Sequence, residues 1–407
     1  MAPTAGETTV WQVGKGDSTQ LTSRPVRGLD FSPVVTLLEG GIAADWHDCA
    51  QAFVSVEGVP VLDVAVGQSR PGRPLRTDDV MLWYSAGKPL TTVAVLQLWE
   101  QRRLELDDLV AKFVPGWGAG KERATLRHLL THTGGFPMFG RDTYDRDVTY
   151  ADGVAAVAAA PAEWEPGTAA GYHATSSWRV LGAIVEAVDG RPIDEYLRDE
   201  VLGPIGACDT SLGLSLDEQA RLGERIVPIA WKGHVLPKVD ADGALSMAPY
   251  RVDKLHNEPW HIAKVEPAGG MRGPASSLAR FYESLLGFGP RLLDPHTVDT
   301  MTAVHRFGMK DGVLGRRIPW GLGVQVEFSG GTTHRAFGHG GMASSRALAD
   351  PTCGLVMVVI ANGLPNFIAA ERRPFQVTDA VYTALGDDVA PFRKPVEELG
   401  KAFGLST

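Results

Sequence analysis

The stretch Tyr84-Ser85-Ala86-Gly87-Lys88 places a serine and a lysine three residues apart, directly before a run from Pro89 to Trp99 that is apolar nearly all round. Such a run predicts a buried helix. Residues three apart lie on one helix face, so the lysine amine can reach the serine hydroxyl. Burial lowers the pKa of a lysine, and a helix N-terminus favours a developing anion. The stretch therefore predicts Ser85 as a nucleophile beside Lys88.

Length and composition indicate a large α/β protein, either one unit or two lobes that share a site. The chain has 407 residues, of which 44% are hydrophobic and 21% charged, as in ordinary globular proteins. The formal net charge of −9 without a basic block argues against nucleic acid and anionic membrane surfaces as partners. No apolar run approaches the roughly 20 residues of a membrane helix.

The cysteines and the N-terminus bear on location. Cys49, Cys208 and Cys353 are few, odd in number and far apart, which fits a reducing compartment better than a disulfide framework. The first residues contain neither the basic region nor the apolar core of a secretory signal. These features predict a cytoplasmic protein.

Strand patterns occupy both ends of the chain, and helix patterns occupy the middle. Two β-rich runs, 52–56 and 59–66, flank Glu57-Gly58, which predicts a hairpin. Residues 230–265 show no regular pattern, and such a loop often lines a site. We expect both termini, 1–90 and 265–407, to form an α/β lobe, with a helical lobe, 91–264, inserted between them. Further strands are predicted at 323–328, 335–337, 345–350 and 355–361, and helices at 32–41, 125–131, 154–160, 177–188, 276–286 and 377–385.

Further motifs follow Ser85–Lys88 at intervals along the chain. They are Leu104–Asp108, Leu126–Gly135, Glu165–Gly167, Gly171-Tyr172, Leu181–Glu186, Pro267–Gly270 and Gly338–Gly341. In order and spacing they resemble the serine β-lactamase-like group of class C β-lactamases, family VIII esterases and penicillin-binding proteins, which includes natural-product acyltransferases. The resemblance spans about Phe31 to Leu385. It implies an α/β serine β-lactamase-like fold, with a mixed, mainly antiparallel sheet flanked by helices, a helical lobe, and the active site between lobes.

The resemblance assigns catalytic roles to Tyr172 and His339, in addition to Ser85 and Lys88. Tyr172 matches the catalytic tyrosine of the family, which faces the nucleophile from the helical lobe. Beside a lysine cation its phenol could share the base role and later protonate the leaving group. Either Lys88 or Tyr172 is the base, and the pair can titrate as a unit. His339 begins the strand that matches the Lys-Thr-Gly motif, where it could orient substrate or hydrogen-bond Tyr172.

The same strand is expected to bind substrate. Gly340 and Gly341 would let a substrate lie against the strand backbone. The backbone N–H groups of Met342 and Ser85 would form the oxyanion hole. His173, which follows the catalytic tyrosine, and Trp260, in the irregular stretch, are further candidates for substrate or acceptor binding.

Two departures from the family pattern argue against β-lactams as substrates. The family motif Tyr-x-Asn is here Tyr172-His173-Ala174, and alanine cannot donate to the β-lactam amide side chain. His339 stands where the β-lactamases have the lysine that helps to hold the β-lactam carboxylate. Acyl transfer itself is unaffected, because Ser85, Lys88 and Tyr172 are all present.

These observations favour a serine hydrolase that forms an acyl-enzyme from a small-molecule ester or thioester, most simply a carboxylic ester hydrolase. One alternative is an acyltransferase that passes the acyl group to an amine or alcohol in natural-product biosynthesis. A second is a penicillin-binding or sensor module that acylates without turnover. No metal or organic cofactor is implied. His128 and His132 lack the acidic residue of a zinc-protease motif, and we expect them to shape packing and loops.

Overall fold

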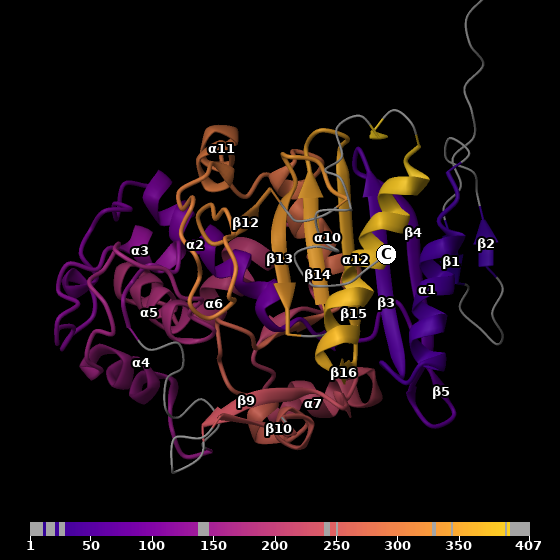
Figure 1. Cartoon of the computed structure of the whole chain (residues 1–407), viewed down its shortest axis with the longest axis horizontal. Coiled ribbons are helices and arrows are strands. Elements are labelled where there is room, and N and C mark those ends of the chain that lie inside the picture. The colour runs from indigo at the N-terminus through magenta and orange to yellow at the C-terminus, as the bar shows by residue number, and fades with distance from the viewer. Residues whose placement is uncertain are drawn as a thin grey trace, which may run out of the picture.

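The computed structural model describes residues 11–13, 21–23, 29–136, 146–239, 245–249, 251–327, 331–342, 345–386 and 389–390. Within them, nine strands form one sheet in the order β12-β13-β14-β15-β3-β4-β1-β2, with β5 beside β4 (Figure 1). All neighbours are antiparallel except β1 and β4. The mixed, mainly antiparallel sheet is as predicted. Its strands are β1 Trp11–Val13, β2 Leu21–Ser23, β3 Cys49–Val56, β4 Val59–Arg70, β5 Arg73–Pro74, β12 Gln325–Val326, β13 Phe337–Gly341, β14 Ser345–Asp350 and β15 Leu355–Ala361.

Helices cover both faces of this sheet (Figure 1). On one face lie α1 (Ser32–Ala43) and α12 (Phe367–Ala384), and on the other lies α10 (Ala275–Leu285). Along β15, Met357 packs toward α1 and α12, whereas its neighbour Val358 joins the larger core that includes α10. A strand buried on both faces reads as a continuous apolar run. This is why β14 and β15 have the bounds that the sequence predicts.

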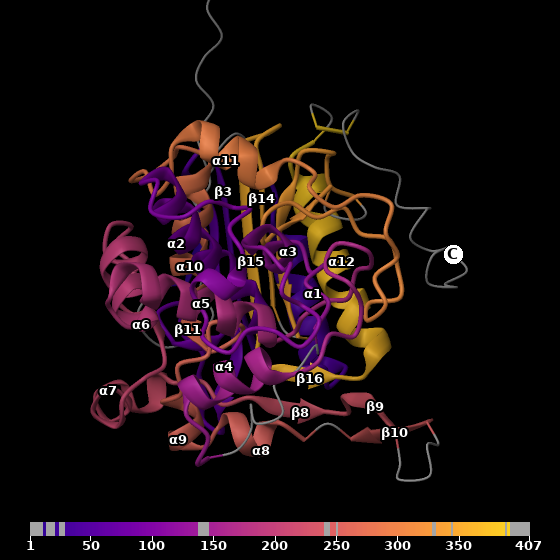
Figure 2. The ribbon, with the colours of Figure 1, turned by 90° about the vertical axis from the view of Figure 1, so that its left-hand side faces the viewer.

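A group of helices lies to one side of the sheet (Figures 1 and 2). All of them belong to the middle of the chain, whereas the sheet strands come from its two ends. The lobe boundaries at 90/91 and 264/265 stay a prediction. The helices of this side are α2 Lys88–Glu100, α3 Leu126–Leu130, α4 Tyr150–Ala159, α5 Ser176–Asp189 and α6 Ile193–Tyr196.

Glycine has different roles in the β3–β4 turn and in helix α1. Glu57 and Gly58 join β3 to β4 with φ of +51° and +74°, the backbone of a tight hairpin turn. The predicted hairpin is confirmed. In α1, by contrast, Gly40-Gly41 does not end the helix, which continues to Ala43. A Cβ on Gly41 would lie 2.2 Å from Cε1 of His47, so this glycine admits a close contact and does not terminate the helix.

The stretch 230–265 is more regular than expected. Its described residues form three short strands and two short helices. Of the strands, β8 pairs with β16, and β9 pairs with β10. Elsewhere α12 begins ten residues earlier than predicted, and α10 begins after Pro274, so that Ser276 and Ser277 lie in its first turn and do not cap it. The short elements are β8 Ala230–Lys232, β9 Val235–Val239, β10 Leu245–Pro249, β16 Gly363–Pro365, α8 Asp253–His256 and α9 Pro259–Ile262.

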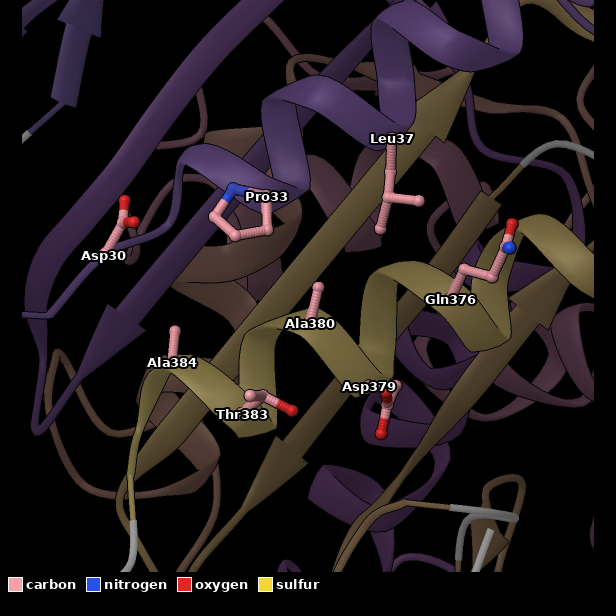
Figure 3. A pocket seen from close by; sticks show the side chains of 8 residues that line it. All are labelled: Asp30, Pro33, Leu37, Gln376, Asp379, Ala380, Thr383 and Ala384. Atoms are coloured by element: carbon pink, nitrogen blue, oxygen red, sulfur yellow. The ribbon is translucent and has the colours of Figure 1, made fainter. Parts of the chain in front are cut away.

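A small three-stranded sheet in the order β6-β11-β7 adjoins the turn that contains Ser85. Its strands are β6 Met81–Leu82, β7 Ser211–Leu212 and β11 Met271–Gly273. Away from it, an open groove of about 640 Å³ lies between α1 and α12, and it is lined by none of the predicted site residues (Figure 3). Among the described residues, no helix has the length and apolar character needed to cross a membrane.

Candidate active site

The predicted nucleophile lies in a tight turn. Ser85 belongs to the 3-10 turn Tyr84–Gly87, and α2 begins at Lys88. Tyr84 has a φ of +51°, which is uncommon for a residue other than glycine. Its hydroxyl is hydrogen-bonded to Nδ1 of His256 at 2.9 Å, which anchors the turn. Within residues 79–96 only Ser85 is not fully buried, so the turn exposes this side chain from an otherwise closed core.

Lys88 is fully buried beside Ser85. Its Nζ lies 3.0 Å from the Oγ of Ser85, 2.7 Å from the carbonyl oxygen of Ala174 and 2.5 Å from that of Ala268. Burial lowers the pKa of Lys88 to about 7. A neutral amine has two N–H donors and one lone pair. The two carbonyls require the donors, so the lone pair is left for the Ser85 hydroxyl.

Tyr172 is held by its backbone and by a cluster of rings. Its N–H donates to Oδ1 of Asp311 at 3.0 Å, and its ring centroid lies 4.6 Å from that of His132 and 6.1 Å from that of Trp320. The Nζ of Lys88 lies 5.5 Å from the centroid of the Tyr172 ring. Burial raises the pKa of the Tyr172 phenol, and a side-chain hydrogen bond with Ser85 acts in the opposite direction. The phenol is therefore protonated at neutral pH.

His339 stands on β13 near both Tyr172 and Trp320, whose ring centroids lie 6.1 Å and 5.7 Å from that of His339. Burial lowers the pKa of His339 to about 3, so the ring is neutral. Its Nδ1 lies 2.6 Å from the carbonyl oxygen of Gly340 and therefore carries the proton. Its Nε2 is then an acceptor, and it is buried with no hydrogen-bond partner among the described residues.

Gly341 of β13 lies against the turn that contains Ser85. A Cβ on Gly341 would be 2.3 Å from the carbonyl oxygen of Trp83 and 3.0 Å from Cβ of Tyr84, so only glycine permits this approach. Gly340 has no such neighbour within 3.4 Å. Met342 follows, and its side chain packs against the apolar cluster around Tyr84. The strand and the turn are thus in direct contact.

His173 and Trp260 each pack against neighbouring rings. His173 is fully buried, and its ring centroid is 4.3 Å from that of Phe136. Its backbone N–H donates to Nδ1 of His132. Trp260 lies on α9 and packs edge-on against His261, at a centroid distance of 5.6 Å. The structure brings neither side chain to the Ser85 hydroxyl, and their role in binding substrate or acceptor stays a prediction.

His128 and His132 both have clear partners within the fold. Nδ1 of His128 accepts the N–H of Thr125 in the cap of α3. Nδ1 of His132 accepts the N–H of His173, and its ring contacts Tyr172. Among the described residues, no three side chains of the His, Cys, Asp or Glu type are grouped to hold a metal.

Two ion pairs that the sequence analysis missed support the site, the first buried and the second partly buried. Arg306 donates to Asp311 at 3.2 Å behind Tyr172, and Arg179 donates to Glu266 at 2.7 Å behind Lys88. Their partners are 5 and 87 residues apart in the chain. A single sequence offers no periodic signal for such pairs. Only the motif Pro267–Gly270 marked the turn that adjoins Glu266.

Comparison with known proteins identifies the family. The model of the family described as "Beta-lactamase" matches residues 35–380. The chain belongs to the β-lactamase family. Its curated relatives include a putative D-alanyl-D-alanine carboxypeptidase of Escherichia coli K12, 24% identical over 72% of this chain and 74% of that protein. They also include the monacolin J acid methylbutanoyltransferase of Aspergillus terreus, 27% identical over 56% of this chain and 58% of that protein.

The fold comparison agrees. A family VIII carboxylesterase superposes with a TM-score of 0.73 at 25% identity, over 87% of this chain and 97% of that one. The predicted family, fold class and enzyme class, a serine hydrolase or acyltransferase of the β-lactamase-like type, are confirmed. The family motif Tyr-x-Asn is reduced here to a backbone contact, because Ala174 offers Lys88 only its carbonyl oxygen.

Proposed function

We propose that this β-lactamase-family enzyme hydrolyses small carboxylic esters through an acyl-enzyme on Ser85. The observation that carries the proposal is the contact set of the Lys88 amine, which satisfies two carbonyls and leaves its lone pair for the Ser85 hydroxyl. A base works best with a pKa near the operating pH, and burial gives Lys88 such a pKa.

In the proposed reaction, Oγ of Ser85 attacks the ester carbonyl carbon while its proton passes to Lys88. The backbone N–H groups of Ser85 and Met342 would stabilise the oxyanion. When the intermediate collapses, the bond to the alkoxide leaving group breaks, and the proton on Lys88 reaches that oxygen through the Tyr172 hydroxyl. Water then attacks the acyl-enzyme by the same route, releases the acid and restores Ser85.

We assign the base role to Lys88 because the Tyr172 phenol keeps its proton. Tyr172 then relays that proton, and the neutral ring of His339 orients it or the substrate. The donor would be a small ester or thioester. We place the enzyme in the cytoplasm, in keeping with its three free cysteines, Cys49, Cys208 and Cys353.

Acyl transfer is the second candidate. The similarity to the methylbutanoyltransferase favours it, since that protein is named for passing an acyl group to another small molecule. Both reactions share the acyl-enzyme and differ only in whether water or an acceptor amine or alcohol is better positioned. A module that acylates without turnover would instead stop at this intermediate.

Intact-protein mass spectrometry tests the proposal. With a panel of esters and thioesters, wild type should gain one acyl mass and lose it again as free acid forms. A fluorophosphonate should label Ser85 alone, and Ser85→Ala should neither label nor turn over. Full labelling of Ser85→Ala would refute the assignment, and an adduct that never decays would favour the non-turnover module.

A further inference from the structure

A carboxylate stands behind the amine of Lys88. Oε2 of Glu266 accepts a hydrogen bond of 2.7 Å from Nε of Arg179, and Oε1 accepts one of 3.2 Å from the N–H of Ala268. Ala268 in turn presents its carbonyl oxygen to Nζ of Lys88 at 2.5 Å. A continuous series of contacts therefore runs from Arg179 on α5, through Glu266 and Ala268, to the first residue of α2.

Glu266 also shapes the turn that carries this carbonyl. Its own backbone oxygen accepts the N–H groups of Gly269 at 3.1 Å and Gly270 at 2.7 Å. The turn is tight, since a Cβ on Gly270 would lie 3.0 Å from that oxygen. Side chain and backbone of Glu266 together fix the place of the Ala268 carbonyl, and with it the direction of the Lys88 amine.

The pair also acts on Lys88 through charge. Arg179 is 6% exposed and the side chain of Glu266 is 15% exposed, so water screens this ion pair less than it screens a pair on the surface. Burial lowers the pKa of Lys88, and the charge of Glu266 raises it.

The other titratable groups that face Lys88 are uncharged. Tyr172 and His132 face it from the helical side and His339 faces it from β13. The pKa of the phenol is raised, and the pKa values of both rings are lowered. Among the described residues, the charge of Glu266 is therefore the one that raises the pKa of this amine.

We propose that the Arg179–Glu266 ion pair positions Lys88 for proton transfer and sets the pH range in which Lys88 acts as the base. This inference rests on the proposed function of Ser85 and Lys88. Glu266 and Arg179 are positioning residues, since they act through Ala268 and through charge. Without the carboxylate, Lys88 would lose its proton at a lower pH and would be a weaker base for the Ser85 hydroxyl.

The test is the pH profile of Glu266→Gln, measured as kcat/KM for p-nitrophenyl butyrate between pH 5 and 9 with product quantified by chromatography. Glutamine keeps an oxygen acceptor, so a purely structural role would leave the profile unchanged. We expect the acid limb to move to lower pH by about half a unit or more, with a several-fold lower plateau. Superimposable acid limbs would overturn the inference.

Two further variants sharpen the result. Glu283→Gln removes a buried carboxylate, which accepts a hydrogen bond of 2.6 Å from Oγ of Ser55, and should leave the acid limb unchanged. If Glu266→Gln does not fold, Arg179→Lys keeps the net charge but loses the Nε bond. Arg179→Lys should lower kcat and shift the acid limb of the pH profile. If both kcat and the acid limb are unaltered, the inference is rejected.

Ser85→Ala separates the two levels of the proposal. Full activity in Ser85→Ala would remove the proposed function itself, and with it this inference. An inactive Ser85→Ala together with superimposable profiles for Glu266→Gln and wild type would reject only the role of the ion pair.

Discussion

The buried carboxylate of Asp311 accepts a hydrogen bond of 3.0 Å from the backbone N–H of Tyr172, which lies 139 residues earlier in the chain. The same Oδ1 accepts the N–H groups of Val313 and Leu314 at 3.0 and 2.9 Å, and Oδ2 pairs with Arg306. One carboxylate thus joins the loop before β12 to the segment that carries Tyr172.

Asp311→Asn should destabilise the protein and slow its reaction. The change leaves the guanidinium of Arg306 buried without a counter-charge, which costs about 3 kcal/mol. The neutral amide oxygen of asparagine is also a weaker acceptor for the N–H of Tyr172 than the carboxylate, so the backbone of Tyr172 is held less firmly and we expect kcat to fall roughly tenfold or more. Thermal melting and ester hydrolysis measure the two effects. The control is Glu165→Gln, from the exposed pair with Arg123, which should change stability by less than about 1 kcal/mol.

Lys88→Ala and Tyr172→Phe should each lower kcat by about 10² or more, the usual contribution of a positioned acid or base. Because the two groups pass one proton between them, the double variant should be little worse than the poorer single variant. Steady-state kinetics of all four proteins forms the cycle. If the fold-loss in kcat of the double variant equals the product of the two single losses, the two residues act independently.

Activity should fall as pH drops through about 7. Lys88 accepts the Ser85 proton only when neutral, and burial lowers its pKa from 10.5 to about 7. The neutral form dominates above that value, so kcat/KM should be level there and fall about tenfold per unit well below it. The unfolded chain binds more protons between pH 7 and 10.5, so this group also adds stability as pH rises through that range. A profile that stays flat down to pH 5 would contradict the assignment of Lys88 as base.

β-Lactams should be poor substrates. The neutral ring of His339 cannot attract the β-lactam carboxylate, and Ala174 has no side-chain amide for the acyl group. The loss of two such hydrogen bonds lowers kcat/KM for nitrocefin by roughly 10² or more relative to p-nitrophenyl butyrate. Comparable values for the two substrates would overturn this expectation, and Ala174→Asn with His339→Lys should narrow the gap.

Partitioning of the acyl-enzyme should favour water. If the enzyme is an esterase, a p-nitrophenyl ester with millimolar amines and alcohols should give free acid, and the acceptors should not accelerate deacylation. Chromatography of acid against conjugate provides the measurement. A conjugate that dominates with one class of acceptor would establish acyl transfer in place of hydrolysis.

The sequence by itself determined the local structure and the family. The two β-rich runs on either side of Glu57-Gly58 predict a hairpin, because a two-residue connection between such strands requires a tight turn. The continuous apolar run Leu355–Ala361 predicts a strand buried on both faces. The catalytic roles of Ser85, Lys88 and Tyr172 were likewise predicted from motifs, because their spacing is short or their neighbours are characteristic.

Only the tertiary structure decided what surrounds these residues. The carbonyls of Ala174 and Ala268 that fix the Lys88 amine come from backbone atoms, which a sequence pattern does not specify. Glu266 and Asp311 act through partners that the fold brings together from distant segments. Gly41 reads as a helix stop until the ring of His47 is seen against it. Burial follows from packing, and burial is what lowers the pKa of Lys88 to about 7 and keeps His339 uncharged.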